Sequence, residues 1–187
     1  MGNLSIGTQG ASYYDWTRKG RVFSALATVT APVIYSTATG TGGPLLWNNS
    51  LANGNAVNAV ILAIGADVTT ASGVSTTLGL TGNSGQTTAP GTTTAIDAGP
   101  ANMFIGGGAS PLCNLYRKGT VTTAGNFFMP THTLDTGAVT TVAMLPAWVD
   151  IGGLIVVPPG SWCAVSSAAT ATSAVVNVGI IWVEVPA

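Results

Sequence analysis

The sequence predicts an all-β chain that folds as a single β-sandwich, and three observations support this class. Residues that favour helices, such as Glu, Lys, Gln and Arg, are scarce, and no long stretch repeats apolar residues at helical spacing. Thr, Val, Ile and aromatic residues dominate instead. The 25 glycines and 10 prolines separate the apolar segments as turns do. Because about eight strands joined by loops are expected, a jelly roll is the favoured topology.

A chain of 187 residues suits one domain with a terminal segment. We expect residues 1–20 to form an extended N-terminal arm and residues 21–187 to form the β-sandwich domain. The low-complexity residues 82–100 and the glycine-rich residues 99–111 are expected to be loops. The predicted strands are residues 22–30, 55–67, 73–81, 121–129, 139–144, 153–157, 161–167 and 173–185.

The clearest strand signals lie near the C-terminus. Residues 151–165 predict a strand, a turn and a second strand, because Pro158-Pro159-Gly160 supplies the fixed and permissive φ values that a reversal needs. The last predicted strand has two faces that are both largely apolar. It is therefore expected to be central, or buried between the sandwich and a neighbouring subunit. One face holds Val176, Val178, Ile180 and Trp182, and the other holds Asn177, Gly179, Ile181 and Val183.

Charged side chains are rare in this chain. Only 5 Lys and Arg and 6 Asp and Glu occur, which is 6% of the residues, whereas a free globular domain carries about 25%. Most of the surface must therefore be neutral or apolar. We expect such a surface to be covered by other protein in an assembly. The net charge of −1 gives no long-range attraction for nucleic acid.

The sequence also bears on the compartment. No apolar run approaches the ~18 residues that a membrane-spanning helix requires, so no membrane role is expected. Residues 1–7 contain no basic region followed by an apolar core, so no secretory signal is predicted. Cys113 and Cys163 lie far apart in no metal-like spacing, and they are expected to be buried thiols that act as small apolar side chains. The sequence leaves open whether the two cysteines form a disulfide. Synthesis in a reducing cytosol fits both their spacing and their interpretation as buried thiols.

All five cations lie in two short near-copies, Thr17-Arg18-Lys19-Gly20-Arg21 and Tyr116-Arg117-Lys118-Gly119-Thr120. We expect these cations to meet carboxylates of a partner, with neighbouring aromatic residues as anchors. Two alternatives remain, namely solvated loops and, less favoured with so few cations, contacts to phosphates or bases of nucleic acid. The candidate partner-binding residues are Tyr13, Tyr14, Trp16, Arg18, Lys19, Arg21, Arg117 and Lys118.

Catalytic and metal-binding signals are weak, so neither an enzyme nor a cofactor or metal site is expected. The single histidine, His132, is interpreted as a loop residue between strands. A hydrolase built from Thr131, His132 and Asp135 is a minor alternative, since sequence proximity alone does not supply a triad. The Gly106-Gly107-Gly108 run lacks the Lys and the Ser or Thr of a phosphate-binding loop. The carboxylates are dispersed singly, at Asp15, Asp67, Asp97, Asp135, Asp150 and Glu184.

Tryptophans offer a second kind of recognition. An exposed Trp ring stacks on a sugar when polar groups lie beside it. Two pairings meet this requirement in the sequence, namely Trp148 with Asp150, and Trp47 with Asn48 and Asn49. A carbohydrate-binding function is therefore kept as an alternative to protein contact.

Four apolar segments follow one another along the chain, namely Gly20-Arg21-Val22-Phe23-Ser24-Ala25, Asn58-Ala59-Val60-Ile61-Leu62-Ala63-Ile64-Gly65, Ile155-Val156-Val157-Pro158-Pro159-Gly160 and Val178-Gly179-Ile180-Ile181-Trp182-Val183-Glu184-Val185-Pro186. Together these segments resemble a group of tailed-bacteriophage virion proteins of the capsid decoration (cement) or head-fibre type. The resemblance spans most of the chain in order.

This resemblance implies a virion structural protein that stabilises a phage head through protein–protein contacts. It implies the major capsid protein and neighbouring copies of the chain as partners, in a homo-oligomer for which a trimer is favoured over a dimer. Synthesis in the host bacterial cytoplasm and a final place on the outer capsid surface follow from the same resemblance. The alternative is a tail or fibre adhesin that recognises a host surface glycan.

Overall fold

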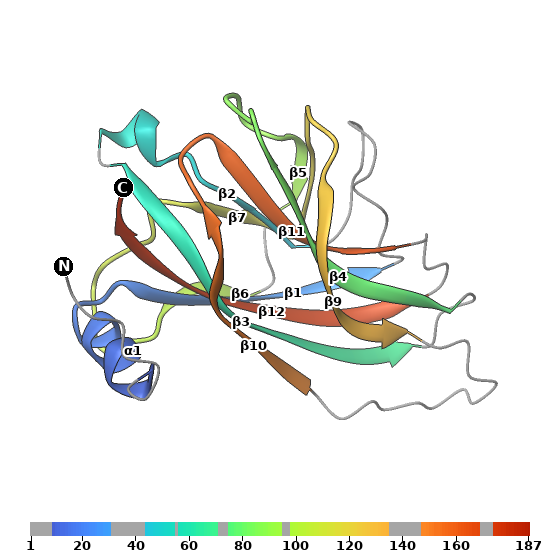
Figure 1. Ribbon diagram of the computed structural model, residues 1–187, viewed down its shortest axis with the longest axis horizontal. Helices are drawn as coiled ribbons and strands as arrows, with labels where there is room; N and C mark the ends of the chain where they lie inside the picture. The colour runs from blue at the N-terminus through green and yellow to red at the C-terminus, as the bar shows by residue number, and fades with distance from the viewer. Residues whose placement is uncertain are drawn as a thin grey trace.

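We describe a computed structural model in which residues 9–30, 44–54, 56–70, 75–94, 98–134, 147–168 and 174–187 are defined. These residues form one helix, a short 3₁₀ turn and twelve strands (Figure 1). The elements are α1 (Gln9–Arg18), β1 (Val22–Thr30), β2 (Leu45–Trp47), the 3₁₀ turn (Ser50–Asn53), β3 (Val57–Thr70), β4 (Thr76–Ser84), β5 (Gly91–Thr94), β6 (Ala98–Asn102), β7 (Asn114–Tyr116), β8 (Lys118–Thr120), β9 (Asn126–Leu134), β10 (Ala147–Val157), β11 (Ser161–Ser167) and β12 (Val175–Pro186).

Two five-stranded antiparallel sheets pack face to face, so the predicted all-β sandwich is confirmed. Sheet A has the order β10-β3-β12-β1-β6, and sheet B has the order β7-β2-β11-β4-β9. Strands β5 and β8 pair separately. Within the part of the chain that the structure describes, no helix is long and apolar enough to cross a membrane.

The eight principal strands are nested from the ends of the chain inward. The first strand, β1, pairs with the last, β12, and β2 pairs with β11. In the same way β3 pairs with β10, and β4 pairs with β9. Split between two sheets, this nesting is the jelly-roll arrangement that the sequence favoured. The chain between β4 and β9 is an excursion that adds β6 to sheet A beside β1 and β7 to sheet B beside β2.

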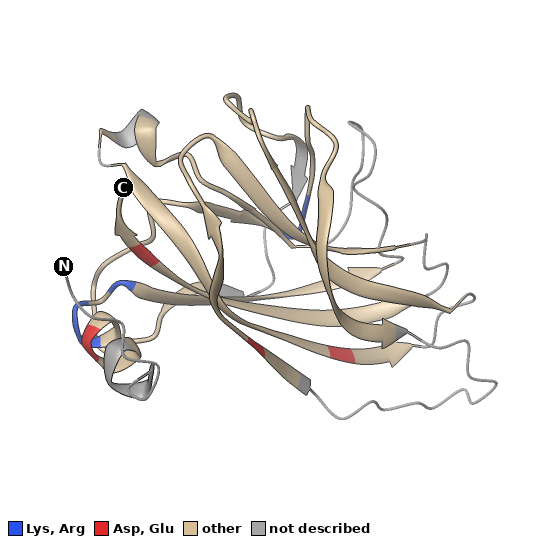
Figure 2. Cartoon of the chain, in the orientation of Figure 1, with Lys and Arg blue, Asp and Glu red and all other residues tan. Residues whose placement is uncertain are grey.

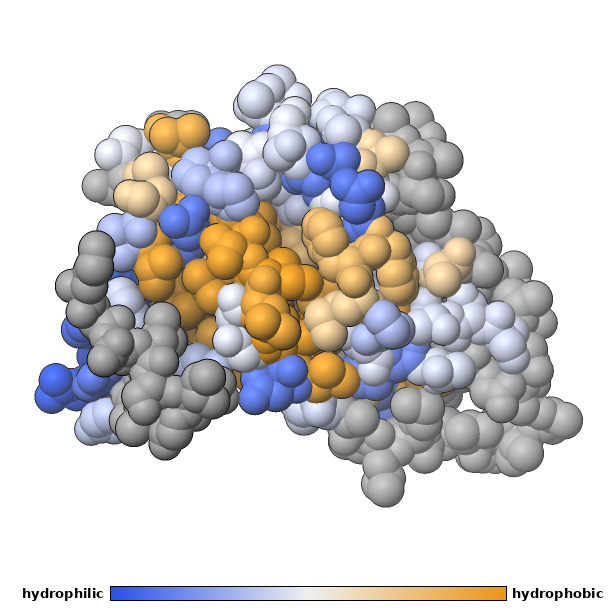
Figure 3. Space-filling model, in the orientation of Figure 1, coloured by the Kyte–Doolittle hydropathy of each residue, from blue (hydrophilic) through white to orange (hydrophobic). Residues whose placement is uncertain are grey.

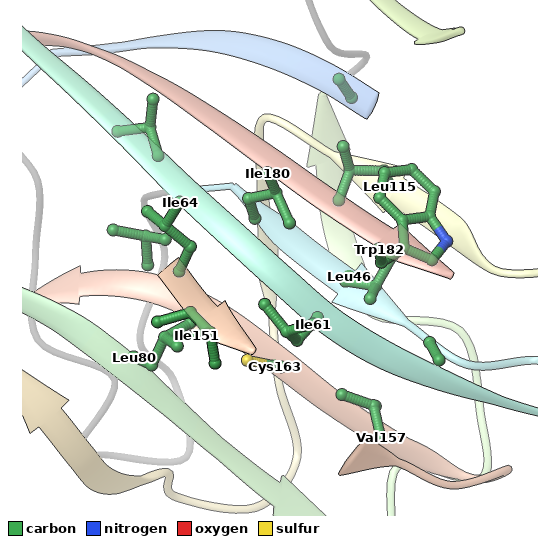
Figure 4. Packing of buried hydrophobic residues seen from close by; sticks show 14 of the residues in the cluster. Leu46, Ile61, Ile64, Leu80, Leu115, Ile151, Val157, Cys163, Ile180 and Trp182 are labelled. Carbon is green, nitrogen blue, oxygen red and sulfur yellow. The ribbon is translucent and has the colours of Figure 1, made fainter. Parts of the chain in front are cut away.

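The core lies between the two sheets and is built by alternation along the strands. In β12, the inward-facing Val176, Val178, Ile180 and Trp182 are each at most 2% exposed. They meet side chains from both sheets in one apolar cluster (Figure 4). Strand β12 is the third of five in sheet A, so its predicted central position is confirmed.

Strand boundaries agree best where a strand is bounded by turn residues. The predictions 22–30 and 161–167 coincide with β1 and β11, and three others overlap β3, β4 and β12 with shifted ends. The prediction 121–129 begins and ends too early, because β9 runs from Asn126 to Leu134, and the prediction 153–157 covers only the end of β10. The predicted strand 139–144 lies outside the described residues.

The loop prediction for residues 82–100 and 99–111 is partly wrong. Strand β4 continues to Ser84, and this region also contains β5 and β6. Strand β6 includes Gly99 and Pro100, which argue against a strand in the sequence. A proline has no backbone N–H to donate. It is tolerated there because β6 is an edge strand, and one side of an edge strand makes no hydrogen bonds to a neighbouring strand.

The prediction of an extended arm is wrong for residues 9–18, which form α1. Ten residues are too few for a stable helix alone, so tertiary contacts must support it. Tyr13 and Trp16, at i and i+3, pack on the outer face of sheet A against Val22, Leu62 and Val183.

The helix ends in the hydrogen-bond pattern of a Schellman motif. The N–H of Arg21 donates to the carbonyl of Trp16 at 3.1 Å, and the N–H of Gly20 donates to the carbonyl of Thr17 at 2.8 Å. Gly20 has φ +67°, which an L-residue rarely adopts, so the glycine of the first basic near-copy is a helix terminator.

Candidate functional site

The first basic near-copy is the exposed C-terminal end of α1. The side chains of Arg18, Lys19 and Arg21 are all exposed, and the Lys19 Nζ lies 4.9 Å from the centre of the Trp16 ring. Tyr14, which is 65% exposed, points away from sheet A, whereas Tyr13 and Trp16 are half-buried on it. Burial, and then the charge of Asp150, raises the pKa of Tyr13. Two of the three predicted aromatic anchors therefore pack within the chain.

The second near-copy has a different structure. Arg117 links β7 to β8 and is half-buried, and Lys118 begins β8 and is exposed. Burial raises the pKa of the neighbouring Tyr116. The two basic segments lie apart on the molecule, so they form two surfaces (Figure 2).

The sandwich has two sides, at which the edges of sheets A and B face each other. At one side, residues 103–113 cross from β6 of sheet A to β7 of sheet B, and we call this the closed side. Its anchor is the buried Glu184 of β12, whose carboxylate accepts hydrogen bonds from the N–H of Leu112 at 2.9 Å and of Cys113 at 2.9 Å. Trp182 Nε1 donates to the same carboxylate at 3.4 Å.

At the other side, which we call the open side, the edge strands β9 and β10 are irregular. In β9, Thr131 and Phe128 have no partner residue in β4, because the register shifts at each of these positions. Pro130 lacks the backbone N–H that a strand residue would donate. In β10, residues 151–154 lie opposite Leu62 alone. Gly152 and Gly153, with φ +59° and +82°, allow this bulge. Such edges resist pairing with a strand of another molecule and leave the side chains of this side as its accessible surface.

A groove of about 560 Å³ runs along the open side between the two sheets. Its walls come from β4, β9, β10 and β11, and the buried Trp162 and Cys163 lie among them. Leu154 is 84% exposed, and Phe128 and Val156 are about half exposed. Figure 3 shows the apolar surface over this part of the molecule. The volume is in the range of pockets that bury small ligands or side chains.

A second, smaller hollow of about 320 Å³ lies on the outer face of sheet A. A Cβ at Gly65 would lie 2.8–3.0 Å from three atoms of the Trp148 indole, so one face of the ring lies flat over that glycine. The ring extends to Gly179 and remains 57% exposed. Asp67 and Asn177 line the same hollow.

The other predicted sugar platform is wrong. Trp47 is buried, and its Nε1 donates to the carbonyl of Gln86 at 2.8 Å. Asn48 is buried as well, and its Nδ2 donates to the carbonyls of Val57 and Val157, both at 2.7 Å. Both side chains hold the fold together because a polar side chain is buried only when its hydrogen bonds are made.

The histidine prediction is corrected in one respect. His132 is a buried strand residue of β9 rather than a loop residue, because β9 continues beyond it to Leu134. The Thr131 hydroxyl donates to the carbonyl of Leu78 at 3.2 Å, and Asp135 lies outside the described residues. Among the residues that the structure defines, no three His, Cys, Asp or Glu side chains gather as a metal site would require.

Both cysteines are buried free thiols, as the apolar interpretation predicts. Burial raises the pKa of Cys163 to about 12. The pKa of Cys113 is also raised, by burial and by the neighbouring Glu184 carboxylate. Neither thiol is therefore a nucleophile near neutral pH.

Sequence reasoning did not find the apolar residues of the open side. Two signals for them were present, namely the Gly152-Gly153 pair beside a predicted strand, which is typical of a bulge, and Pro130, which is typical of an edge strand. No protein-family model matches this chain, and neither a curated protein nor a solved structure matches it.

Proposed function

We propose that this chain is a non-catalytic virion structural protein that decorates a phage head and stabilises it through protein–protein contacts. The observation that carries the proposal is the combination of few charges with large exposed apolar side chains. Eleven such side chains are exposed in the described part of the chain, in a protein with only 11 charged residues. A surface of this kind is typical of a protein that is covered by neighbours.

The architecture supports this role in a second way. The bulged edges of the open side disfavour uncontrolled strand pairing, while the groove remains available to side chains. A decorating subunit adds contact area at junctions of a shell, and stable contacts bury ~800 Å² on each partner. Several such contacts on one particle then act together through avidity.

Electron cryomicroscopy of particles of the phage that encodes the chain tests this proposal directly. The expected result is density for the jelly roll on the outer surface of the head, bound to the major capsid protein as a homo-oligomer. Particles that lack the chain at every position would contradict the proposal.

A mutational test addresses the basic turn of α1. Replacing Arg18, Lys19 and Arg21 by Ser should reduce binding to purified heads by about tenfold, as expected for three peripheral charges, while the fold is kept. The matched variant Arg117→Ser with Lys118→Ser tests the second basic segment separately. Unchanged head occupancy in both variants would remove these cations from the contact.

Recognition of a host surface glycan by a tail or fibre adhesin is a second candidate function. The Trp148 hollow favours it, because a flat, open ring face beside a carboxylate and an amide suits a sugar that is apolar on its face and polar at its rim. A glycan array with the wild type and Trp148→Ala tests this candidate. Binding that the variant loses would support an adhesin, and an array without any bound glycan would reject it.

A further inference from the structure

The closed side carries a projecting apolar loop that the core does not use. Met103, Phe104 and Ile105, which we call the knob, follow β6 at the start of the crossing segment. Ile105 is 96% exposed, and Met103 and Phe104 are 42% and 45% exposed. Three consecutive apolar side chains that face solvent at a loop tip are unfavourable for an isolated molecule.

Hydrogen bonds hold the knob in one conformation. The Asn102 side chain accepts from the N–H of Phe104 at 2.9 Å and donates to the carbonyls of Gly20 at 3.0 Å and Ala109 at 3.1 Å. The N–H of Gly107 donates to the carbonyl of Phe104 at 2.7 Å, and Gly106 has φ +88°, as the third position of a type II turn requires. A loop fixed in this way loses little entropy when it binds.

The groove and the knob lie at opposite sides of the sandwich. The knob follows β6 at one edge of sheet A, whereas the groove is lined by β10 at the other edge. The knob of a chain therefore cannot enter the groove of the same chain. An apolar protrusion and an apolar groove on opposite sides fit a head-to-tail contact between copies.

The charges around the two surfaces are complementary. The carbonyl of Gly20, which Asn102 binds, lies between the exposed Lys19 and Arg21, so two cations flank the base of the knob. At the other edge of sheet A, β10 carries the exposed Asp150 a few residues before the groove residue Leu154. Asp150 does not line the groove itself, and its charge also acts on Tyr13 of the chain's own α1. Opposite charges at the rim of an apolar contact orient the partners and exclude the reversed arrangement.

We propose that the knob of one copy seats in the open-side groove of a second copy, with Lys19 and Arg21 directed toward Asp150 of that copy. The inference rests on the proposed function, in which neighbouring copies are partners, and it names the surfaces through which they meet. The contact is heterologous, so successive copies form a closed ring when the rotation closes and a filament when it does not.

Disulfide trapping tests the contact. Chains with Ile105→Cys and chains with Leu154→Cys are mixed and oxidised, and mixed dimers are quantified by mass spectrometry. The native thiols are buried and remain in place. Leu26→Cys, on the outer face of sheet A and 44% exposed, replaces Leu154→Cys as the matched control. We expect mixed dimers from Ile105→Cys with Leu154→Cys in clear excess over the control pair, and equal yields would overturn the contact.

A second variant does not depend on oxidation. Ile105→Ser should weaken self-association by about tenfold or more, since it removes one buried aliphatic side chain from the contact, and it should leave the melting temperature of the dilute chain unchanged. Self-association equal to that of the wild type would overturn the proposal. If the chain is found on phage heads while trapping shows no preference, this contact is wrong and the proposed function stands. If trapping succeeds but the chain is absent from heads, the contact between copies stands and the proposed function is wrong.

Discussion

At the closed side of the sandwich, residues 103–113 cross between the sheets, whereas at the open side the edge strands β9 and β10 leave a groove. Both sides contain apolar residues at the edges of the same two sheets. At the closed side, Leu115 and Cys113 join the core, and Glu184 binds the backbone that covers it. At the open side, Leu154 is 84% exposed. The difference is that the chain covers one side with its own residues and leaves the other exposed, and this exposed side is the one that we propose a second copy covers.

The largest expected effect is on the anchor of the closed side. Glu184→Leu leaves the buried N–H of Cys113 and the partly buried N–H of Leu112 without an acceptor, so the free energy of unfolding should fall by about 3 kcal/mol. Glu184→Gln keeps one acceptor oxygen and should lose about 1 kcal/mol. Urea unfolding measures both variants. Equal stability of Glu184→Leu and the wild type would show that this carboxylate does not hold the closed side.

The stability of the chain at alkaline pH tests whether water is excluded from the Cys163 thiol, which lines the groove. The pKa of Cys163 is raised from 9.0 to about 12 in the folded chain. The neutral, buried thiol therefore makes its full contribution to the free energy of unfolding below pH 9. This contribution is lost as the pH rises toward 12, because the thiol of the unfolded chain ionises first. Between pH 8 and 10 this loss is about 1.4 kcal/mol for one thiol.

The control for this pH dependence is Cys163→Ala, which should lose less stability over the same pH range in urea unfolding. An identical pH dependence of the two proteins would mean that water reaches the thiol through the groove.

A smaller effect is expected where Asn102 fixes the knob. Asn102→Ala removes its three side-chain hydrogen bonds, which are partly exposed, so the loss should be about 1 kcal/mol. Hydrogen exchange at the N–H of Phe104 should accelerate in the same variant. Unchanged exchange would mean that the turn is held without this side chain.

The smallest effect is expected at the open side. Leu154→Ser should change the free energy of unfolding of the isolated chain by less than about 0.5 kcal/mol, because an exposed side chain contributes little to folding. The same urea measurement applies. A loss comparable with that of Glu184→Leu would show that the open side is part of the core, and the contrast between the two sides would disappear.

The sequence predicted those parts of the fold that depend on local patterns. Strands β1, β11 and β12 are rich in residues that favour strands and lie within or close to the predicted bounds, and the Pro158-Pro159-Gly160 turn separates β10 from β11 as predicted. This turn carries the chain from β10 in sheet A to β11 in sheet B, which local sequence cannot show because sheet membership depends on distant pairing.

The sequence did not predict the parts that depend on tertiary contacts. Helix α1 lacks a long periodic pattern and is supported by Tyr13 and Trp16 on sheet A. The two basic near-copies look alike, yet one ends a helix and the other lies in strands, because neighbouring segments decide the structure of such short motifs. In the sequence Glu184 is one of six singly dispersed carboxylates, and only folding brings the Leu112 and Cys113 backbone to it.

Sedimentation velocity of the purified wild-type chain, over a wide range of concentrations and with or without purified phage heads, is the most direct test that its exposed apolar surface is a contact surface. We predict species larger than the monomer that grow with concentration, and co-sedimentation with the heads. A single monomeric species at the highest concentration, with none of the chain sedimenting with the heads, would contradict this conclusion.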